Sequence, residues 1–178
     1  MTETKTLNTM RSVAKAQEFQ QTGRKLKRKI QTYEKHFSHP AEDVFYQFCP
    51  TRELDWIDGW DCELVYTTTG YVEKDCIFTT AADNYIGPGL WIFTNYVPNE
   101  RLELVRILGN DVVIHFRIHL RDNGDATSTG VWHLTFTALN EQGNQVVDNL
   151  PERIQELEQA IDGLEYFLTE GELMRNVA

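Results

Sequence analysis

Apolar residues recur at three- and four-residue steps near the C-terminus, and this spacing predicts one face of an amphipathic helix. Asn149 is expected to cap its first turn with Glu152 as capping-box partner, and Gly171 is expected to end it. Gly163 interrupts the apolar face, so we expect room there for a ligand or a closely packed aromatic side chain. The face consists of Ile154, Leu157, Ile161, Leu164, Phe167 and Leu168. Such a helix needs a partner that covers it.

Most of the preceding chain alternates between apolar and polar residues, as antiparallel strands do. A first strand is predicted at 26–37, followed by a short helix from Pro40 and a second short helix or turn at 51–60. Six further strands are predicted at 62–68, 71–80, 90–97, 101–108, 111–121 and 125–139. Strands flanked by segregated helices indicate the α+β class. We therefore predict a curled antiparallel sheet of about seven strands wrapped around the C-terminal helix.

Two hairpins allow predictions of register. A three-residue turn ending at Gly70 would place Cys62 opposite Cys76. In the last hairpin, Asn123-Gly124 suits a two-residue turn, but that register would set apolar residues against polar ones. A three-residue turn starting at Asp122 instead puts Trp132, Leu134 and Phe136 on the face of Ile114, Phe116, Ile118 and Leu120. With that choice, His115, Arg117, His119 and His133 share the opposite, solvent-facing side.

Charge is unevenly distributed along the 178 residues, whose net charge is −10. Residues 1–29 hold eight of the 17 Lys/Arg and two of the 27 Asp/Glu, so the remainder is strongly acidic. An acidic body argues against a nucleic-acid partner or an anionic membrane surface. The basic run at 23–29 is expected to be a solvated extension, or to contact an anion or an acidic partner surface.

No apolar run is long enough to span a membrane, and no secretory signal opens the chain, so membrane insertion is not expected. The three cysteines form an odd set without the spacing of a disulfide framework, which favours the reducing cytoplasm. The strand at 90–97 is apolar on both faces, and it would support a homodimer if it formed an exposed sheet edge.

The order of elements, together with four segments, resembles the SRPBCC (START-like, helix-grip) superfamily. Those segments are 49–70, 90–102, 135–145 and 164–172. The resemblance is to a bacterial branch with the signature Cys-Pro-x-Arg-Glu-x-x-Trp-Ile-x-Gly-Trp-x-Cys, here Cys49, Pro50, Arg52, Glu53, Trp56, Ile57, Gly59, Trp60 and Cys62. It covers a domain at 29–172, leaving an N-terminal extension at 1–28 and a tail at 173–178. It implies an apolar cavity between sheet and helix, and it supplies no catalytic residues.

The densest combination of polar and aromatic residues in the sequence is formed by Arg52 and Glu53 together with the nearby Trp56 and Trp60. They either orient a ligand in an aromatic cavity or form an ion pair that fixes the short helices, with both tryptophans in the core. The full set of candidate cavity residues is Arg52, Glu53, Trp56, Trp60, Tyr66, Phe78, Trp91, Phe93, Tyr96, Phe116, Trp132, Leu157, Ile161 and Leu164.

Two other groups could carry chemistry. Cys49, Cys62 and Cys76, with His36, could form a metal or redox cluster, but their spacing matches no zinc motif, and buried free cysteines usually pack as small apolar residues. His115, His119 and His133 could hold a metal, or an anion around Arg117, although a solvated sheet face is the more common arrangement. No metal and no cofactor is therefore expected.

Three functions are compatible with these patterns. The first is a soluble binding protein for a hydrophobic or aromatic small molecule, without enzymatic activity. The second is a cyclase or dehydratase of polyketide-like substrates that uses a buried carboxylate or tyrosine. The third is a protein-interaction module whose cavity is filled by its own side chains. An open cavity would exclude the third, and a buried carboxylate in that cavity, with a raised pKa, would favour the second.

Overall fold

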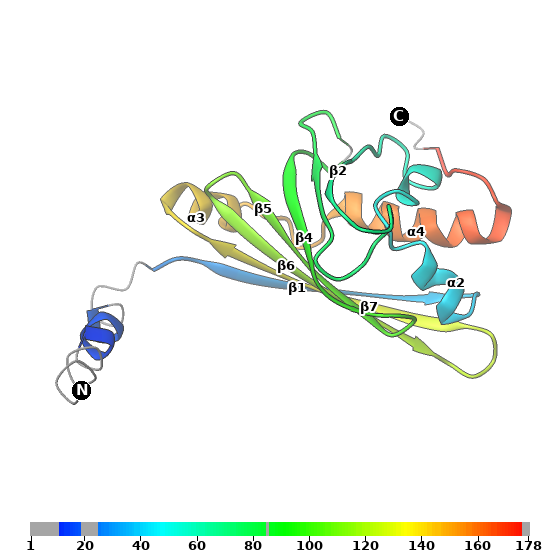
Figure 1. Ribbon diagram of the computed structural model, residues 1–178, viewed down its shortest axis with the longest axis horizontal. Coiled ribbons are helices and arrows are strands. Elements are labelled where there is room, and N and C mark those ends of the chain that lie inside the picture. The colour runs from blue at the N-terminus through cyan, green and yellow to red at the C-terminus, as the bar shows by residue number, and fades with distance from the viewer. Residues whose placement is uncertain (1–10, 19–24, 85, 176–178) are drawn as a thin grey trace.

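Seven antiparallel strands form one sheet in the order β1-β7-β6-β5-β4-β3-β2 (Figure 1). The computed structural model describes residues 11–18, 25–84 and 86–175. The strands are β1 (Arg28–Phe37), β2 (Glu63–Tyr66), β3 (Ile77–Thr80), β4 (Gly89–Val97), β5 (Arg101–Leu108), β6 (Val112–Asp122) and β7 (Ser128–Ala138). The helices are α2 (Ala41–Tyr46), the 3-10 turn η1 (Glu53–Asp55), α3 (Glu141–Asp148) and α4 (Gln155–Glu170). The predicted α+β class and its seven strands are confirmed.

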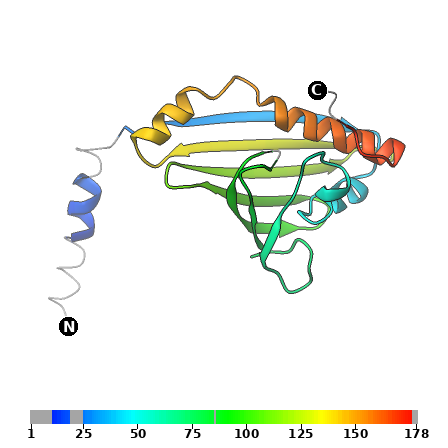
Figure 2. The same cartoon turned by 90° about the horizontal axis from the view of Figure 1, so that it is seen from above.

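The sheet curls, and its inner face carries most of the core (Figure 2). Along β7, Trp132, Leu134 and Phe136 are buried, while the residues between them keep accessible surface. Phe136 pairs with Ile114 and Leu134 with Phe116 on β6, so both strands present apolar side chains to the same side. The period of two along a strand therefore places the core where the sequence predicts it.

The connection between β6 and β7 is longer than predicted, yet the predicted faces are correct. Asp122 pairs with Ser128, which leaves five residues in the loop instead of three. Adding two residues preserves the side to which each later residue points, because side chains alternate with a period of two. Inside the loop the Asn123 side chain bonds Thr127 Oγ1 at 2.9 Å, and Gly124 takes a φ of +82°.

The predicted register of the hairpin after η1 is wrong. Leu64 pairs with Phe78 and Tyr66 with Ile77, so Cys62 does not lie opposite Cys76, and ten residues connect β2 to β3. The Glu73 carboxylate organises this loop: it accepts hydrogen bonds from the Thr68 N–H at 2.6 Å and from the Thr68 hydroxyl at 2.8 Å. These hydrogen bonds stabilise the ten-residue loop, and a three-residue turn would not contain them.

β4 is not a sheet edge, so the condition under which it would support a homodimer is not met. It lies between β3 and β5 in the strand order, and the two edges of the sheet are β1 and β2. A register shift between Phe93 and Asn95 marks a bulge in β4. The bulge brings Tyr96 to the same face as Phe93, while Leu90 and Ile92, which precede it, are apolar residues on the opposite face.

The C-terminal helix begins five residues later than predicted, because its N-cap is Ile154 and not Asn149. Asn149 ends the additional helix α3 instead of starting α4, and its N–H bonds the Gln145 carbonyl at 3.1 Å. α3 was not predicted from the sequence; the side chain of its N-cap residue Asn140 accepts a 2.8 Å hydrogen bond from the Gly143 N–H. Gly171 ends α4 as predicted, with a φ of +72° and its N–H on the Phe167 carbonyl.

The described part of the basic run contacts the chain's own C-terminal region. Lys27 pairs with Asp148, Arg28 Nε donates to Thr137 Oγ1 at 3.0 Å, and Lys29 Nζ donates to the Leu150 carbonyl at 2.7 Å. Residues 11–18 form an exposed helical segment, while 1–10, 19–24 and 176–178 lie outside the described residues. The domain boundaries therefore stay predictions. None of the described helices is both long and apolar enough to cross a membrane.

Candidate functional site

A cavity of about 530 Å³ lies between the inner face of the sheet and α4. Strands β3 to β7 contribute one wall, and the apolar face of α4 contributes another through Leu157, Ile161 and Leu164. Glu53, Trp56 and neighbouring residues of the η1 segment bound it as well. Part of the apolar face of α4 therefore packs on the rest of the fold, and the remainder borders the cavity.

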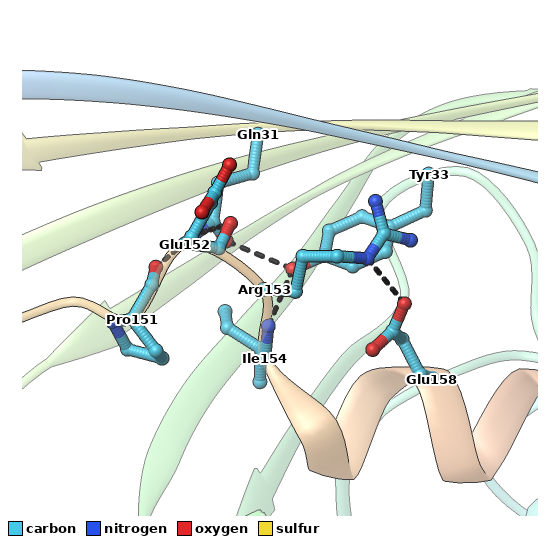
Figure 3. Close-up of polar contacts among 7 residues, drawn as sticks. All are labelled: Gln31, Tyr33, Pro151, Glu152, Arg153, Ile154 and Glu158. Carbon is cyan, nitrogen blue, oxygen red and sulfur yellow. Dashed lines mark hydrogen bonds and ion pairs between the residues drawn. The ribbon is translucent and has the colours of Figure 1, made fainter.

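The linker between α3 and α4 forms a third wall, and hydrogen bonds from β1 hold it in place (Figure 3). The Gln31 amide donates to the Pro151 carbonyl at 2.6 Å and to the Glu152 carbonyl at 3.1 Å. The Tyr33 hydroxyl donates to Gln31 Oε1 at 3.0 Å and accepts from the Ile154 N–H at 2.7 Å. Because Gln31 and Tyr33 are buried, these bonds are shielded from water.

Eleven of the fourteen predicted cavity residues border this cavity. They are Glu53, Trp56, Trp60, Phe78, Trp91, Phe93, Phe116, Trp132, Leu157, Ile161 and Leu164. Many of the rings contact one another: Phe78 and Trp91 stack with centroids 5.4 Å apart, and Trp91 lies 5.5 Å from Phe116. Whether these residues bind a ligand stays a prediction.

The other three predicted residues lie elsewhere. The Arg52 guanidinium sits 3.3 Å above the Tyr46 ring and 4.8 Å from that of Tyr71, outside the cavity. Tyr66 is 56 % exposed on the edge strand β2. Tyr96 packs against Phe45 of α2, with ring centroids 5.3 Å apart. The tight turn that follows Pro50 separates Arg52 from Glu53, and the two form no ion pair among the described residues.

Among the acidic residues of the cavity wall, Glu53 has the pKa that burial raises most. Protein surrounds its side chain, and desolvation raises the pKa of the carboxyl to about 8. Part of its surface is nevertheless accessible, which we attribute to the cavity it borders. No hydrogen bond reaches the carboxyl from the described residues. At pH 7 Glu53 is therefore mainly an uncharged carboxylic acid that can donate a proton.

The two tryptophans of the η1 segment differ in how their N–H groups are satisfied. Trp60 Nε1 donates to the Pro50 carbonyl at 2.8 Å, which fixes that indole. Trp56 Nε1 is buried and has no hydrogen-bond partner among the described residues. An unpaired buried donor costs about 1–3 kcal/mol, so this indole lowers the stability of the cavity wall. The Trp56 backbone packs against α4, where its carbonyl oxygen lies 3.6 Å from the position of a Cβ on Gly163.

Arg106 on β5 is a cavity residue that the sequence analysis did not identify. It is 8 % exposed and borders the cavity within the inward row Leu102, Leu104, Arg106 and Leu108. Its guanidinium donates to the carbonyls of Ile86, Gly87 and Pro88 and lies 4.7 Å from the Trp91 ring. Desolvation lowers its pKa to about 10, so it stays charged at pH 7. The sequence did contain a signal for Arg106, because a charged residue stands at an inward position of a strand in which apolar and polar residues alternate.

The three cysteines lie near one another, and Cys49 and Cys62 are hydrogen-bonded to the surrounding backbone. Cys49 Sγ accepts a hydrogen bond from the Val72 N–H at 3.2 Å, and Cys62 Sγ donates to the Pro50 carbonyl at 3.4 Å. Burial raises the pKa of Cys62 to about 11, which suppresses its thiolate. All three cysteines are free thiols. Across the described ranges, no group of three or more His, Cys, Asp or Glu side chains is arranged around a possible metal ion.

The three histidines of β6 and β7 lie on the outer face, as predicted from the alternation. His115 contacts Glu103 at 3.1 Å, and His133 contacts Thr32 on β1 at 3.1 Å. His119 is exposed. They therefore belong to a partly solvated surface away from the cavity.

Solved structures similar to this chain share its architecture. Norcoclaurine synthase from Thalictrum flavum, in complex with dopamine and hydroxybenzaldehyde, matches with a TM-score of 0.62 and 14% identity over 84% of this chain and 91% of that one. A protein from Rhizobium leguminosarum matches with a TM-score of 0.60 and 16% identity, covering 82% and 97% of the two chains. Ara h 8.0201 matches with a TM-score of 0.60 and 13% identity, covering 81% and 99%.

This chain has a helix-grip fold. At these identities the similarity shows the fold alone. No family model matches the sequence, and no curated protein matches it. The branch signature from Cys49 to Cys62 therefore stays a prediction.

Proposed function

We propose that this chain binds a hydrophobic or aromatic small molecule in the cavity between the sheet and α4. The observation that carries the proposal is the cavity itself, whose volume is about 530 Å³ and whose wall is mainly aromatic and aliphatic with few polar groups. Small-molecule sites are typically about 300–1,000 Å³ and have this composition. The open volume argues against a closed interaction module.

The similar structures add support by analogy. The norcoclaurine synthase structure contains dopamine and hydroxybenzaldehyde, two aromatic molecules, in a protein of the same fold. Fold does not determine ligand, so this supports the class of ligand only weakly. The aromatic rings around the cavity provide the physical support, because they offer stacking surfaces to an aromatic ligand.

Native mass spectrometry of freshly purified protein tests the proposal, followed by extraction of any bound molecule. A titration with the neutral fluorescent probe N-phenyl-1-naphthylamine is the companion measurement. We expect a co-purified species or saturable binding of about one probe per chain. Absence of both, across several expression conditions, would remove the binding function.

A second candidate is an enzyme that uses Glu53 for proton transfer, and the raised pKa of this carboxyl supports it. A protonated Glu53 would donate to a ligand carbonyl oxygen, and the resulting carboxylate would then accept a proton from the adjacent carbon. Deuterium exchange into 2-tetralone, followed by NMR in D₂O, tests this chemistry. The wild type should accelerate exchange at the carbon next to the carbonyl, and Glu53→Gln should not. Exchange at the buffer rate with the wild type would count against an enzyme.

A further inference from the structure

Arg106 places a positive charge inside the cavity, and the surrounding protein does not neutralise it. Three backbone carbonyls accept from a single guanidinium nitrogen, Nη2, at up to 3.1 Å. Within the described ranges, no carboxylate lies within ion-pair distance of Arg106. Carbonyl dipoles solvate a buried cation, but they leave its net charge uncompensated. An anion that enters the cavity would therefore gain a charge-assisted bond.

The polar groups of the cavity wall include several donors without acceptors. Arg106 Nε and Trp56 Nε1 are both buried, and neither has a hydrogen-bond partner in the part of the chain that the structure describes. Protonated Glu53 is a third group that can donate. Neither nitrogen has surface exposed to the cavity, so what the cavity offers a ligand is the uncompensated charge of the Arg106 guanidinium rather than these two N–H groups.

Because Gly89 has no side chain, it leaves space for the Arg106 guanidinium. A Cβ at this position would lie 2.8 Å from Arg106 Nε and 3.2 Å from Trp91 Nε1, so any larger residue would displace the guanidinium. Arg106 also lies against the Trp91 ring, which itself borders the cavity. Backbone, indole and loop carbonyls thus hold the charged group in one position at the cavity wall, and such preorganisation favours specific recognition.

We propose that Arg106 binds the singly charged carboxylate of a ligand whose apolar body fills the cavity, so that the ligand class is an aromatic or aliphatic carboxylic acid. The proposal rests on the proposed binding function and deepens it. A carboxylate fits better than a phosphate, because a single guanidinium in an apolar wall would leave a second negative charge unpaired. The competing explanation is that Arg106 only fastens the loop at 86–88 to β5.

Paired probes separate these explanations. 2-Naphthoate and naphthalene-2-carboxamide have the same apolar body and differ mainly in charge, and decanoate with decanamide gives an aliphatic pair. Calorimetric titration of the wild type at pH 7 should show the acid of at least one pair binding about tenfold or more tightly than its amide. Arg106→Met should bring that ratio close to one, because it should weaken the binding of the acid much more than the binding of the amide. Arg117→Met, on the outer face of the sheet, is the matched control and should preserve the ratio.

A measurement on the wild type covers the case in which Arg106→Met does not fold. In ¹H–¹⁵N NMR spectra, 2-naphthoate should shift the Arg106 Nε–H resonance, and the amide should shift it much less. Amides that bind as tightly as the acids, with no selective shift, would overturn the role of Arg106 and leave apolar binding intact. Failure of all four probes and of N-phenyl-1-naphthylamine would instead remove the binding function itself.

Discussion

The Tyr33 hydroxyl on β1 accepts a 2.7 Å hydrogen bond from the backbone N–H of Ile154, the residue that precedes α4. The two residues are 121 positions apart in sequence. Ile154 is the N-cap residue of α4, and its apolar side chain accepts no hydrogen bond. Its own N–H, which the N3 side chain of a capping box usually binds, instead donates to a hydroxyl of the sheet. This contact sets where α4 begins, and the linker it fixes borders the cavity.

Tyr33→Phe should therefore destabilise the fold without changing its architecture. The substitution removes the acceptor for the Ile154 N–H and the donor to Gln31 Oε1, both in a buried setting. We expect a loss of about 1–3 kcal/mol in the free energy of unfolding, measured by urea titration. Tyr46→Phe is the control, because Tyr46 is exposed and a phenylalanine ring can still pack against the Arg52 guanidinium. Equal stability of the two variants would contradict the role assigned to Tyr33.

Glu53 should make the protein less stable as the pH rises. Its folded pKa of about 8 lies above the ordinary value of 4.5, so the folded state holds this proton more tightly than the unfolded state. The contribution of Glu53 to stability is therefore fully present below pH 4.5 and is lost progressively as the pH rises to 8, on the order of a few kcal/mol.

Glu53→Gln should flatten the pH dependence of unfolding free energy between pH 4.5 and 8. Glu63→Gln, an exposed substitution on β2, should leave it unchanged. Denaturant titrations at several pH values would measure both variants. An unaltered slope in Glu53→Gln would show that this carboxyl is not perturbed by burial.

Two helical glycines should respond to alanine in opposite directions. A Cβ on Gly163 would meet Trp56 O at 3.6 Å and Met174 Cε at 3.7 Å, which is ordinary contact. Gly163→Ala should therefore stabilise the protein by about 0.5–1 kcal/mol through higher helix propensity.

A Cβ on Gly143 of α3 would lie 2.0 Å from the Asp111 carbonyl oxygen, which is a backbone clash. Gly143→Ala should destabilise the protein, and thermal unfolding of both alanine variants would measure the contrast. A stabilising effect of Gly143→Ala would contradict the close packing of α3 on the β5–β6 turn.

Filling the cavity should abolish ligand binding without unfolding the protein. Leu157 on α4 borders the cavity, and Leu157→Trp would place an indole into that space. We expect the affinity for N-phenyl-1-naphthylamine to fall by about tenfold or more. Val65→Trp, on an exposed position of β2, should keep the wild-type affinity. Fluorescence titration compares them, and unchanged binding in Leu157→Trp would place the probe elsewhere.

Much of the fold could be predicted because it depends on local periodicity. The inner face of β6 and β7 follows from alternation, which survives a change of loop length from three residues to five. Gly171 ends α4 because a left-handed residue suits glycine wherever the helix lies in the fold. Trp91, Phe93 and Trp132 reach the cavity wall for the same reason, since large apolar side chains at inward positions must face the interior.

Properties that depend on distant partners could not be predicted. Asn149 and Glu152 match a capping box, yet the residues around them are held by Lys29, Gln31 and Tyr33 of β1, which local sequence does not reveal. The adjacent pair Arg52 and Glu53 separates because the short turn after Pro50 sends one side chain to Tyr46 and the other to the cavity.

The sequence by itself determined which residues alternate, which helix is amphipathic and where that helix ends, because these depend on neighbours within a few positions. Only the tertiary structure decided that α4 begins at Gln155, that Glu53 is buried, and that Arg106 borders the cavity beneath the loop at 86–88. These properties depend on desolvation and on hydrogen bonds between segments far apart in the chain, and folding alone brings those segments together.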